Sequence, residues 1–447
     1  MSDRSLPQAG PDTPGEPPKG ALLAIFLIIL VDFLGFGLII PLLPFYVPDY
    51  QHNPMKVTLI FSIFSICQFV GAPVLGALSD RYGRRPVLIV SQLGSAAGYV
   101  LLGIASTESF GWRPETRLAL VYISRVIDGF TGGNVSTAQA YISDVTTAQN
   151  RAKGMGLIGA AFGIGFCLGP FLGGVLGQFN PTWPAFAAAS LAGWAAFQTW
   201  WWLPEPAIHR PTEVQNWLHP RSFLPVLRRP VLLQLLLIAF ISMAAFVMME
   251  ATVGMFLAQV FGWGAGLPEK EARKVASANT GYFFAYAGVV IALVQGGAIR
   301  PLMKRMSEWP LAVVGPAIVA GGMALFAWLA WWPTFWVAAA AGLVNSVGRS
   351  LQQPTLSSLL SKHSDPREQG VVFGLYHGLS SLARVLGPIV AGLTYPLWRN
   401  TGQFWVAGVI VILAAAWTAV VRGQATAATD GASREQAVAE AARTEIE

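Results

Sequence analysis

The stretch GALSDRYGRRPV, residues 76–87, places four charges within six residues, at Asp80, Arg81, Arg84 and Arg85. Long apolar runs flank it, FSIFSICQFVGAPVL (61–75) on one side and LIVSQLGSAAGYVLLGI (88–104) on the other. A helix needs about 20 mostly apolar residues to cross a bilayer, and both runs extend to roughly that length. The charged stretch is therefore interpreted as a short connection between two membrane helices.

The whole chain has the composition of a membrane protein. Of its 447 residues, 54% are hydrophobic and 12% are charged, and its mean hydropathy is +0.52. These values exclude an ordinary soluble protein. We expect an all-α integral membrane protein with twelve transmembrane helices, at 21–47, 55–78, 86–105, 118–142, 154–178, 184–203, 231–260, 276–299, 309–331, 334–360, 371–395 and 402–421.

The basic residues predict how these helices are oriented. Nineteen of the 29 Lys and Arg residues lie in the terminal arms and the even-numbered loops, seven lie in the odd-numbered loops, and three lie within spans. Positive loops stay on the cytoplasmic side, so both termini are expected in the cytoplasm of a multi-pass protein of the plasma (inner) membrane. The net charge of +6 follows from this topology and gives no reason to expect nucleic-acid binding.

The longest polar interruption divides the spans six and six. The expected organisation has five parts: a disordered cytoplasmic arm 1–20, a six-helix bundle 21–203, a cytoplasmic linker 204–229, a second six-helix bundle 230–422 and a cytoplasmic tail 423–447.

The two bundles look like copies of one unit. The segment GMGLIGAAFGIGFCLGPFLGG (154–174) has a counterpart in GVVFGLYHGLSSLARVLGPIVAG (370–392), and both contain Gly-Pro near the end. Secondary transporters are often built from such six-helix repeats, with the substrate bound where the halves meet. The repeat therefore favours transport.

One expected helix carries small residues at helical spacing. Gly165, Gly169, Gly173 and Gly177 recur every four residues, and Pro170 lies among them. Small residues let another helix approach closely, and proline allows a bend. This pattern suits a moving interface between the halves, although ordinary helix packing would also explain it.

Four segments, taken in chain order, resemble the major facilitator superfamily. VDFLGFGLIIPLLPFY (31–46), GALSDRYGRRPV (76–87), RVIDGFTGGNVSTAQAYISDVT (125–146) and GIGFCLGPFLGG (163–174) are similar to motifs of its drug:proton antiporters, especially the tetracycline exporters. The resemblance implies proton-coupled drug export by alternating access. It also implies a cytoplasmic gate at Gly76, Asp80, Gly83, Arg84 and Asp144, and an antiporter motif at Gly165, Gly169, Pro170, Gly173 and Gly174.

The charged loop also permits predictions from its chemistry. Gly83 allows a positive φ in the tight turn, and Asp80 is expected to accept hydrogen bonds from the free amides at the start of the next helix. Arg84 then has an acidic partner nearby. Arg81 and Arg85 are expected to serve membrane orientation and contact with lipid headgroups. A solvated turn or a purely topogenic signal would explain the same charges.

Asp32 is the leading candidate for a proton carrier. It lies ten residues beyond Leu22, about 15 Å along a helix and therefore near the middle of the bilayer. Hydrocarbon favours the neutral carboxylic acid, and a charge there is costly enough to indicate a function. A fixed structural partnership with an arginine is the alternative. Arg125 and Asp128, three residues apart on one helix face, complete the expected proton-coupling group, or form a purely local pair.

The expected substrate cavity combines polar residues of both halves. Glu250, Arg349, His377 and Arg384 lie within apolar spans of the second half, and Asn134 and Gln139 lie in the first half. These charged residues would either bind a charged substrate or form ion pairs with each other. The substrate charge stays open.

Other classes lack their motifs in this chain. No Gly-Lys dipeptide occurs, so the phosphate-binding loop of an ATP-driven pump is missing, and neither HExxH nor GxSxG is present. We expect no enzyme activity, no catalytic residues, no metal site and no cofactor. The expected partners are the lipid bilayer, protons and a small molecule, and the expected state is a monomer. Two alternatives remain, a proton symporter for organic anions or small solutes, and a receptor-like protein without transport.

Overall fold

The protein folds as a set of long helices. The structure, a computed structural model, describes residues 21–48, 50, 52–107, 110–146, 151–206, 224, 226–364 and 369–444, and no strand occurs in these ranges. The helices of the first half are α1 (Ala21–Ile39), η1 (Ile40–Leu42), α2 (Leu43–Tyr46), α3 (Pro54–Tyr82), α4 (Arg84–Ser106), α5 (Pro114–Thr131), α6 (Asn134–Val145), α7 (Arg151–Phe179) and α8 (Trp183–Trp202). Those of the second half are α10 (Pro230–Val260), α11 (Glu269–Leu293), η3 (Val294–Ala298), α12 (Ile299–Arg305), α13 (Glu308–Trp328), α14 (Phe335–Lys362), α15 (Gln369–Thr394) and α16 (Gly402–Thr444).

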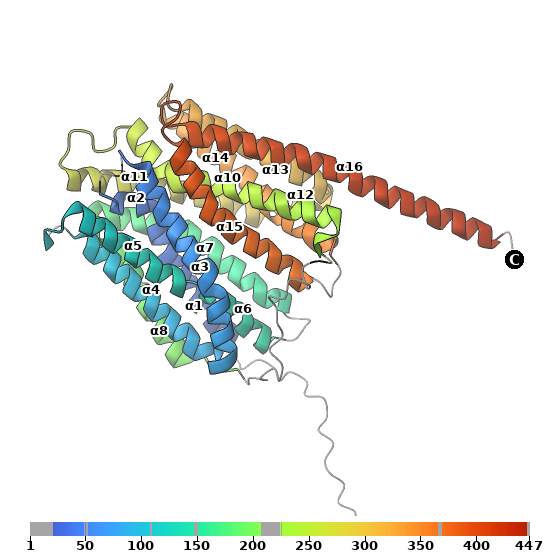
Figure 1. The fold of residues 1–447 in the computed structure, drawn as a ribbon, viewed down its shortest axis with the longest axis horizontal. Helices are drawn as coiled ribbons and strands as arrows, with labels where there is room; N and C mark the ends of the chain where they lie inside the picture. The colour runs from blue at the N-terminus through green and yellow to red at the C-terminus, as the bar shows by residue number, and fades with distance from the viewer. Residues whose placement is uncertain are drawn as a thin grey trace, which may run out of the picture.

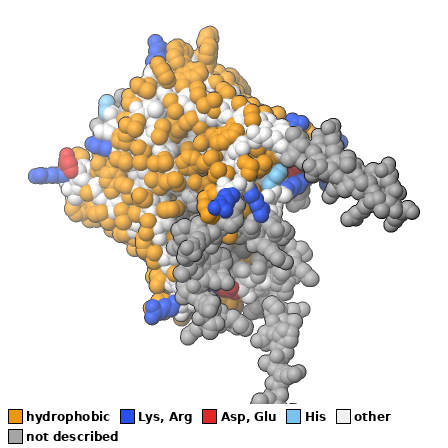
Figure 2. Space-filling view, turned by 45° about the vertical axis from the view of Figure 1, so that its right-hand side comes forward, with side chains coloured by type: hydrophobic (Ala, Val, Ile, Leu, Met, Phe, Trp, Pro, Cys, Tyr) orange, Lys and Arg blue, Asp and Glu red, His pale blue; other side chains and the backbone are white. Residues whose placement is uncertain are grey.

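Helices occupy all twelve ranges where membrane spans are expected. Within the described residues, seven helical stretches are long and apolar enough by themselves to cross a membrane: Ala21–Tyr46, Pro54–Tyr82, Arg84–Ser106, Pro230–Val260, Glu269–Arg305, Glu308–Trp328 and Gly402–Ala425. Hydrophobic side chains cover most of the described surface in Figure 2, and the charged side chains lie at its edges and beside the grey atoms. This surface is suited to contact with lipid chains.

The helices form two bundles that follow the two halves of the sequence (Figure 1). In the first, α1 packs against α7 and α8, and α4 packs against α5 and α8. In the second, α13 packs against α14 and α16, and α10 packs against α15 and α16. The most extensive contacts between the bundles are those of α7 with α11 and of α3 with α15; α10 and α11 also contact η1 and α2, and α10 contacts α3.

The α7–α11 pair is in contact over only part of its length. A Cβ on Gly281 would lie 2.3 Å from the Cα of Gly174, and one on Gly288 would lie 2.8 Å from the Cα of Cys167. Farther along, a Cβ on Gly163 of α7, or on Gly296 of η3, which follows α11 directly, would meet nothing within 4 Å. Helices can approach this closely only where glycine leaves out the side chain, so Gly174, Gly281 and Gly288 determine where α7 and α11 are in contact.

The α3–α15 pair shows the same asymmetry. Ser62 donates a hydrogen bond to the carbonyl of Val385 (2.8 Å), and a Cβ on Gly392 would lie 2.3 Å from Oγ1 of Thr58. By contrast, a Cβ on Gly378 would meet open space. We call the end of the molecule where α3 begins the Pro54 end, and the end where α4 begins the Arg84 end. The seams between the bundles are closed toward the Pro54 end and open toward the Arg84 end.

The fourth expected span, 118–142, is interrupted in the structure. It consists of α5 and α6, separated by a turn at Gly132 and Gly133. A Cβ on Gly133 would lie 2.7 Å from the backbone nitrogen of Ala72, so α3 approaches the turn closely. Two consecutive glycines weaken the helix there, and α3 takes the space that side chains would fill.

The last helix is longer than a membrane span requires. α16 continues to Thr444 and projects beyond the second bundle (Figure 1). The range 423–444, which the sequence assigns to a tail, is therefore helical.

Candidate functional site

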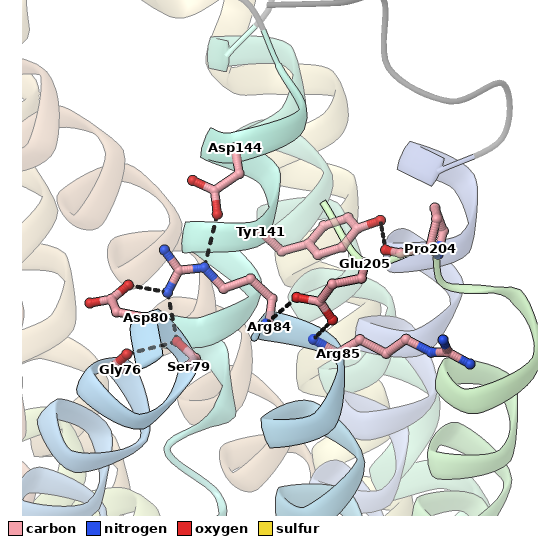
Figure 3. Close-up of polar contacts among 9 residues, drawn as sticks. All are labelled: Gly76, Ser79, Asp80, Arg84, Arg85, Tyr141, Asp144, Pro204 and Glu205. Atoms are coloured by element: carbon pink, nitrogen blue, oxygen red, sulfur yellow. Dashed lines mark hydrogen bonds and ion pairs between the residues drawn. The ribbon is translucent and has the colours of Figure 1, made fainter. Parts of the chain in front are cut away.

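Arg84, the first residue of α4, connects the ends of three helices (Figure 3). Its Nη1 lies 2.5 Å from Oδ1 of Asp80 on α3, and its Nε lies 2.8 Å from Oδ2 of Asp144 on α6. Nη1 also donates to Oγ of Ser79 at 2.6 Å. The structure thus brings Asp80, Arg84 and Asp144 together, beside the turn at Gly83. We call these three residues the Arg84 cluster.

The start of α4 is capped by Glu205, which was not among the residues predicted from the sequence. Glu205, just beyond α8, accepts hydrogen bonds from the backbone amides of Arg84 (2.6 Å) and Arg85 (2.9 Å). The prediction that Asp80 caps this helix is therefore wrong, because the side chain of Asp80 binds the guanidinium of Arg84 instead. Gly83 has φ +108, as expected, and a Cβ there would lie 2.8 Å from Oε1 of Glu205.

Arg85 has a structural role beside this cap. Its guanidinium donates to the carbonyls of Thr199 and Trp200 in the last turn of α8, where a positive charge complements the helix dipole. Tyr141 on α6 adds a hydrogen bond to the carbonyl of Pro204 at 2.9 Å. Two sets of hydrogen bonds therefore hold α4 against α8: Arg85 of α4 donates to the end of α8, and Glu205 just beyond α8 accepts from the start of α4.

The Glu205 cap leads to a prediction about stability. Glu205→Ala should lower the free energy of unfolding by about 0.5–2 kcal/mol, the usual cost of losing a helix cap, because two amides at the start of α4 lose their acceptor. Glu205→Gln retains one acceptor oxygen and should lose less. Thermal unfolding of the purified protein measures both, with exposed Glu115→Gln as the control. Equal stability of the Ala variant and the unmodified protein would show that this cap contributes nothing.

The second bundle contains a counterpart of the Arg84–Asp144 contact. Nζ of Lys362, at the end of α14, lies 2.5 Å from Oε1 of Glu308, at the start of α13, and Ser358 donates to the same oxygen at 3.2 Å. In each half, an ion pair thus joins the start of one expected span to the end of the next span, which in the first half is the interrupted α5–α6, and the charges are exchanged. This pair was not among the residues predicted from the sequence.

Asp32 lies on α1, half-buried, beside the interruption between α5 and α6. Asn134, the first residue of α6, donates a hydrogen bond to its carboxylate. A cavity at this point is lined by six of the polar residues and glycines around it: Asp32, Gln92, Tyr99, Asp128, Gly132 and Asn134.

Side chains from neighbouring helices satisfy the carbonyls exposed by the interruption. Gln68 donates to the carbonyl of Gly132 at 3.0 Å, and Ser91 donates to the carbonyl of Thr131. Irregular backbone within a membrane protein needs such partners, and it commonly lines a binding cavity.

Arg125 and Asp128 form a buried pair on α5. Nη1 of Arg125 lies 3.0 Å from Oδ2 of Asp128, and the two side chains are only 3% and 2% exposed. The guanidinium also lies 5.4 Å from the ring centroid of Tyr99. Since Arg125 is engaged by Asp128, the polar partner of Asp32 is a neutral amide rather than an arginine.

The polar residues predicted for the substrate cavity do not all meet. Glu250 and Arg384 line a second cavity together with Arg125, so this cavity reaches both bundles. Arg349 contacts Sδ of Met243 (3.2 Å) and lies over the ring of Phe246 (4.1 Å). His377 is exposed and contacts the ring of Tyr376, and Gln139 is half-buried. Arg349, His377 and Gln139 line neither of these two cavities.

The glycines of α7 lie between the Asp32 helix and the second bundle. Added Cβ atoms at Gly165, Gly169 and Gly173 would collide with backbone atoms of α1, at Phe33, Gly37 and Leu38 respectively. Gly174 instead faces Gly281 on α11, and the carbonyl of Pro170 lies 2.8 Å from a Cβ built on Gly281. A movement of α11 against α7 would therefore act on the helix that packs directly against α1.

Comparisons with known proteins agree with this architecture. A family model described as Major Facilitator Superfamily matches residues 25–388 and 318–445. The class C tetracycline resistance protein of Escherichia coli is 30% identical over 402 residues, which cover 88% of this chain and 95% of that protein. The major facilitator superfamily domain-containing protein 10 of Bos taurus is 29% identical, over 85% of this chain and 88% of that one.

Solved structures give the same result. The human organic anion transporter MFSD10 (TETRAN) has a TM-score of 0.63 and 26% identity, and the alignment covers 91% of this chain and 100% of that one. A bacterial homolog of the human lysosomal transporter Spinster has a TM-score of 0.70 over 90% of this chain and 96% of that one. Its identity is 16%, so it shows similarity of fold alone.

Proposed function

Because the chain belongs to the major facilitator superfamily, whose members transport small molecules across membranes, we propose that it exports lipophilic compounds in exchange for protons. The tetracycline resistance proteins among its relatives support export of drug-like compounds. It acts in the plasma (inner) membrane as a monomer, with both termini and the Arg84 end in the cytoplasm. The excess of Lys and Arg in the even-numbered loops supports this orientation.

The observation that carries proton coupling is the environment of Asp32. A carboxyl group within an apolar helix is bound by a neutral amide, and the nearby Arg125 is engaged by Asp128. Within the part of the chain that the structure describes, no Lys or Arg forms an ion pair with Asp32 and holds it permanently ionised. When water reaches it the charged form is favoured, and when the water is excluded the protonated form is favoured. Alternating hydration from the two sides would load and release one proton in each cycle.

The seams between the bundles support alternating access. They are closed toward the Pro54 end and open toward the Arg84 end, so this conformation gives access from the cytoplasm. The opposite state would separate Gly174 from Gly281 and bring the Arg84 ends of the bundles together. Such rocking of two repeats around a central site is the usual mechanism in repeat-built transporters.

The Arg84 cluster contributes to this movement as a brace. All three of its residues belong to the first bundle, so it holds the ends of α3, α4 and α6 in a fixed arrangement. Asp80 and Asp144 remain 52% and 34% exposed, and ion pairs so exposed contribute only about 0–1 kcal/mol each. These ion pairs therefore position the helix ends at the cytoplasmic gate, and they add little to the free energy needed to open it.

A second candidate function is uptake of organic anions by proton symport. It is favoured by Arg349 on α14 and Arg384 on α15, which carry positive charge into the second bundle, by the position of Arg384 at a cavity, and by the similarity to the organic anion transporter MFSD10. A receptor-like protein without transport is the third alternative.

Transport in oriented vesicles distinguishes these functions. Inverted membrane vesicles, prepared from cells that lack their own exporters, acidify internally when respiration is energised. An exporter that exchanges protons should accumulate labelled tetracycline or ethidium in these vesicles, and nigericin should abolish the accumulation by collapsing the pH gradient. Accumulation only in right-side-out vesicles would establish symport instead. Gradient-independent distribution of all compounds in both vesicle types would contradict both transport proposals.

A further inference from the structure

The two cavities described above share one wall. We call them the Asp32 cavity and the Glu250 cavity, after an acid that lines each. Phe36 on α1 and Phe64 on α3 line both cavities, and no other residue of the described chain does. We propose that these two rings form an apolar barrier that keeps Asp32 from being hydrated from both sides of the membrane at once. This inference rests on the proposed coupling to protons and assigns the residues that prevent a proton leak.

The order of residues along the first helix places the barrier between the cavities in depth. Asp32, Phe36 and Ile40 follow one another at steps of four residues along α1 and into η1, about 6 Å apart in each step. Asp32 lines only the Asp32 cavity, and Ile40 lines only the Glu250 cavity. The chain continues from η1 through α2 to the start of α3, so this order runs toward the Pro54 end.

Helix α3 shows the same order, with the chain running in the opposite direction. Gln68 lines only the Asp32 cavity, Phe64 lines both, and Phe61 lines only the Glu250 cavity. Because α3 begins at the Pro54 end, the Asp32 cavity again lies toward the open Arg84 end and the Glu250 cavity toward the closed end. The ring centroids of Phe36 and Phe64 are 5.6 Å apart, so the two helices close the passage at one level.

Two aromatic rings in contact oppose the passage of water. A water molecule between them finds no hydrogen-bond partner, and apolar constrictions in channels stop conduction by excluding water in this way. Polar groups lie on both sides of the rings, with Asp32 on one side and Glu250 and Arg384 on the other. Water entering from the Arg84 end therefore reaches Asp32 but does not continue into the Glu250 cavity.

A third ring connects the barrier to the contact between the bundles. The ring centroid of Phe166 on α7 lies 5.8 Å from that of Phe36. The carbonyl of Phe166 lies 3.1 Å from a Cβ built on Gly288, so α11 packs directly against α7 at this residue. Separation of α11 from α7 would remove the support behind Phe166 and let the ring of Phe36 move. Rocking of the bundles would thereby open Asp32 to the Glu250 cavity when that cavity faces the opposite side.

Proton entry in the absence of substrate tests the barrier. The purified protein is reconstituted in liposomes that contain the pH indicator pyranine, with equal K⁺ concentrations and valinomycin so that no membrane potential builds up. After an acid pulse outside, the unmodified protein should acidify the interior little faster than protein-free liposomes do. Phe36→Ala and Phe64→Ala should each raise proton entry severalfold, because the loss of a ring opens a path for water between the cavities.

The matched controls remove the same ring from the wall of one cavity alone. Phe33→Ala changes only the Asp32 cavity and Phe61→Ala only the Glu250 cavity, so both should stay as tight as the unmodified protein. Phe64→Leu, which refills most of the space with an apolar side chain, should also stay tight. Unchanged proton entry in both barrier variants, or an equal increase in the two controls, would overturn the proposal.

Tyrosine variants keep the test valid if an alanine variant does not fold. Phe36→Tyr and Phe64→Tyr retain the ring and its packing, and their hydroxyl groups offer hydrogen bonds to water at the barrier. Proton entry should therefore rise in these variants too, although less than with alanine. If both tyrosine variants fold and stay as tight as the unmodified protein, the rings are not what excludes water.

A double variant separates the barrier from the proposed proton coupling. Adding Asp32→Asn to Phe64→Ala should abolish the added proton entry, because Asp32 passes the proton between the two sides. Proton entry that persists in the double variant would refute Asp32 as the carrier and leave the barrier standing. Loss of pH-driven substrate accumulation in Asp32→Asn, together with alanine variants that fold and stay tight, would refute the barrier alone.

Discussion

Asp32→Asn should reduce pH-gradient-driven accumulation of substrate to the level of protein-free vesicles. Asparagine has nearly the shape of aspartic acid and can still accept a hydrogen bond from Asn134, but it carries no titratable proton. The variant should therefore fold and bind substrate while losing the coupling step. Counterflow of labelled substrate between compartments of equal pH measures the part of the cycle that needs no net proton movement, and it should persist.

The matched control for this substitution is Glu115→Gln, an acid-to-amide change at an exposed position in the first turn of α5. It should leave both pH-driven accumulation and counterflow unchanged. If Asp32→Asn accumulated substrate as the unmodified protein does, another group would have to carry the proton, and Asp128 would be the next candidate. If counterflow were also lost, the position would be needed for more than coupling.

The sequence was sufficient to single out Asp32, because an acid within so long an apolar helix is conspicuous. Its partner could not be predicted in the same way. Asn134 reaches the carboxylate because the expected span 118–142 is interrupted at Gly132 and Gly133, and Asn134 begins the new helix there. A hydropathy profile shows this apolar region as one unbroken span despite its two glycines. It contains no information on the close packing of α3 against Gly133, which accompanies the interruption.

In the loop at the Arg84 end, too, the local features could be predicted from the sequence and the long-range contact could not. The motif itself predicted the positive φ of Gly83 and the meeting of Arg84 with acidic partners, because these depend on a turn of a few residues. Glu205 lies 121 residues from Arg84 and reaches it only because α8 packs against α4. From the sequence alone, a glutamate just beyond a span is interpreted as an ordinary residue of the membrane interface. Its function as a cap becomes visible only in three dimensions.

The two halves contain ion pairs at equivalent positions, formed by different residues. The pairs Arg84–Asp144 and Glu308–Lys362 each join the start of one span to the end of the following span, with α5 and α6 counted as one span, and the charges are reversed between them. A comparison of sequence letters finds no match at these positions. The physical requirement is only that opposite charges meet there, so either order satisfies it. The repeat is thus preserved in the geometry of the contact more clearly than in the identity of its residues.

Breaking the buried pair of α5 should have the largest effect on stability. Arg125→Met would leave Asp128, whose side chain is 2% exposed, without a counter-charge, and Asp128→Leu would do the same to Arg125. Removing one member of a buried ion pair typically costs about 3–5 kcal/mol, because the remaining charge stays desolvated. Each single variant should therefore unfold at clearly lower temperature than the unmodified protein, as measured on the purified protein in detergent.

The double variant Arg125→Met with Asp128→Leu should recover most of this loss, because apolar side chains of similar volume leave no charge behind. The more exposed pair Glu308–Lys362 is the matched control, since Glu308→Gln should cost only about 0–1 kcal/mol. Full recovery of stability without recovery of coupled transport would place Arg125 and Asp128 in the transport cycle. If the two single losses instead added in the double variant, the residues would act independently, and Arg125 would be free to interact with Asp32.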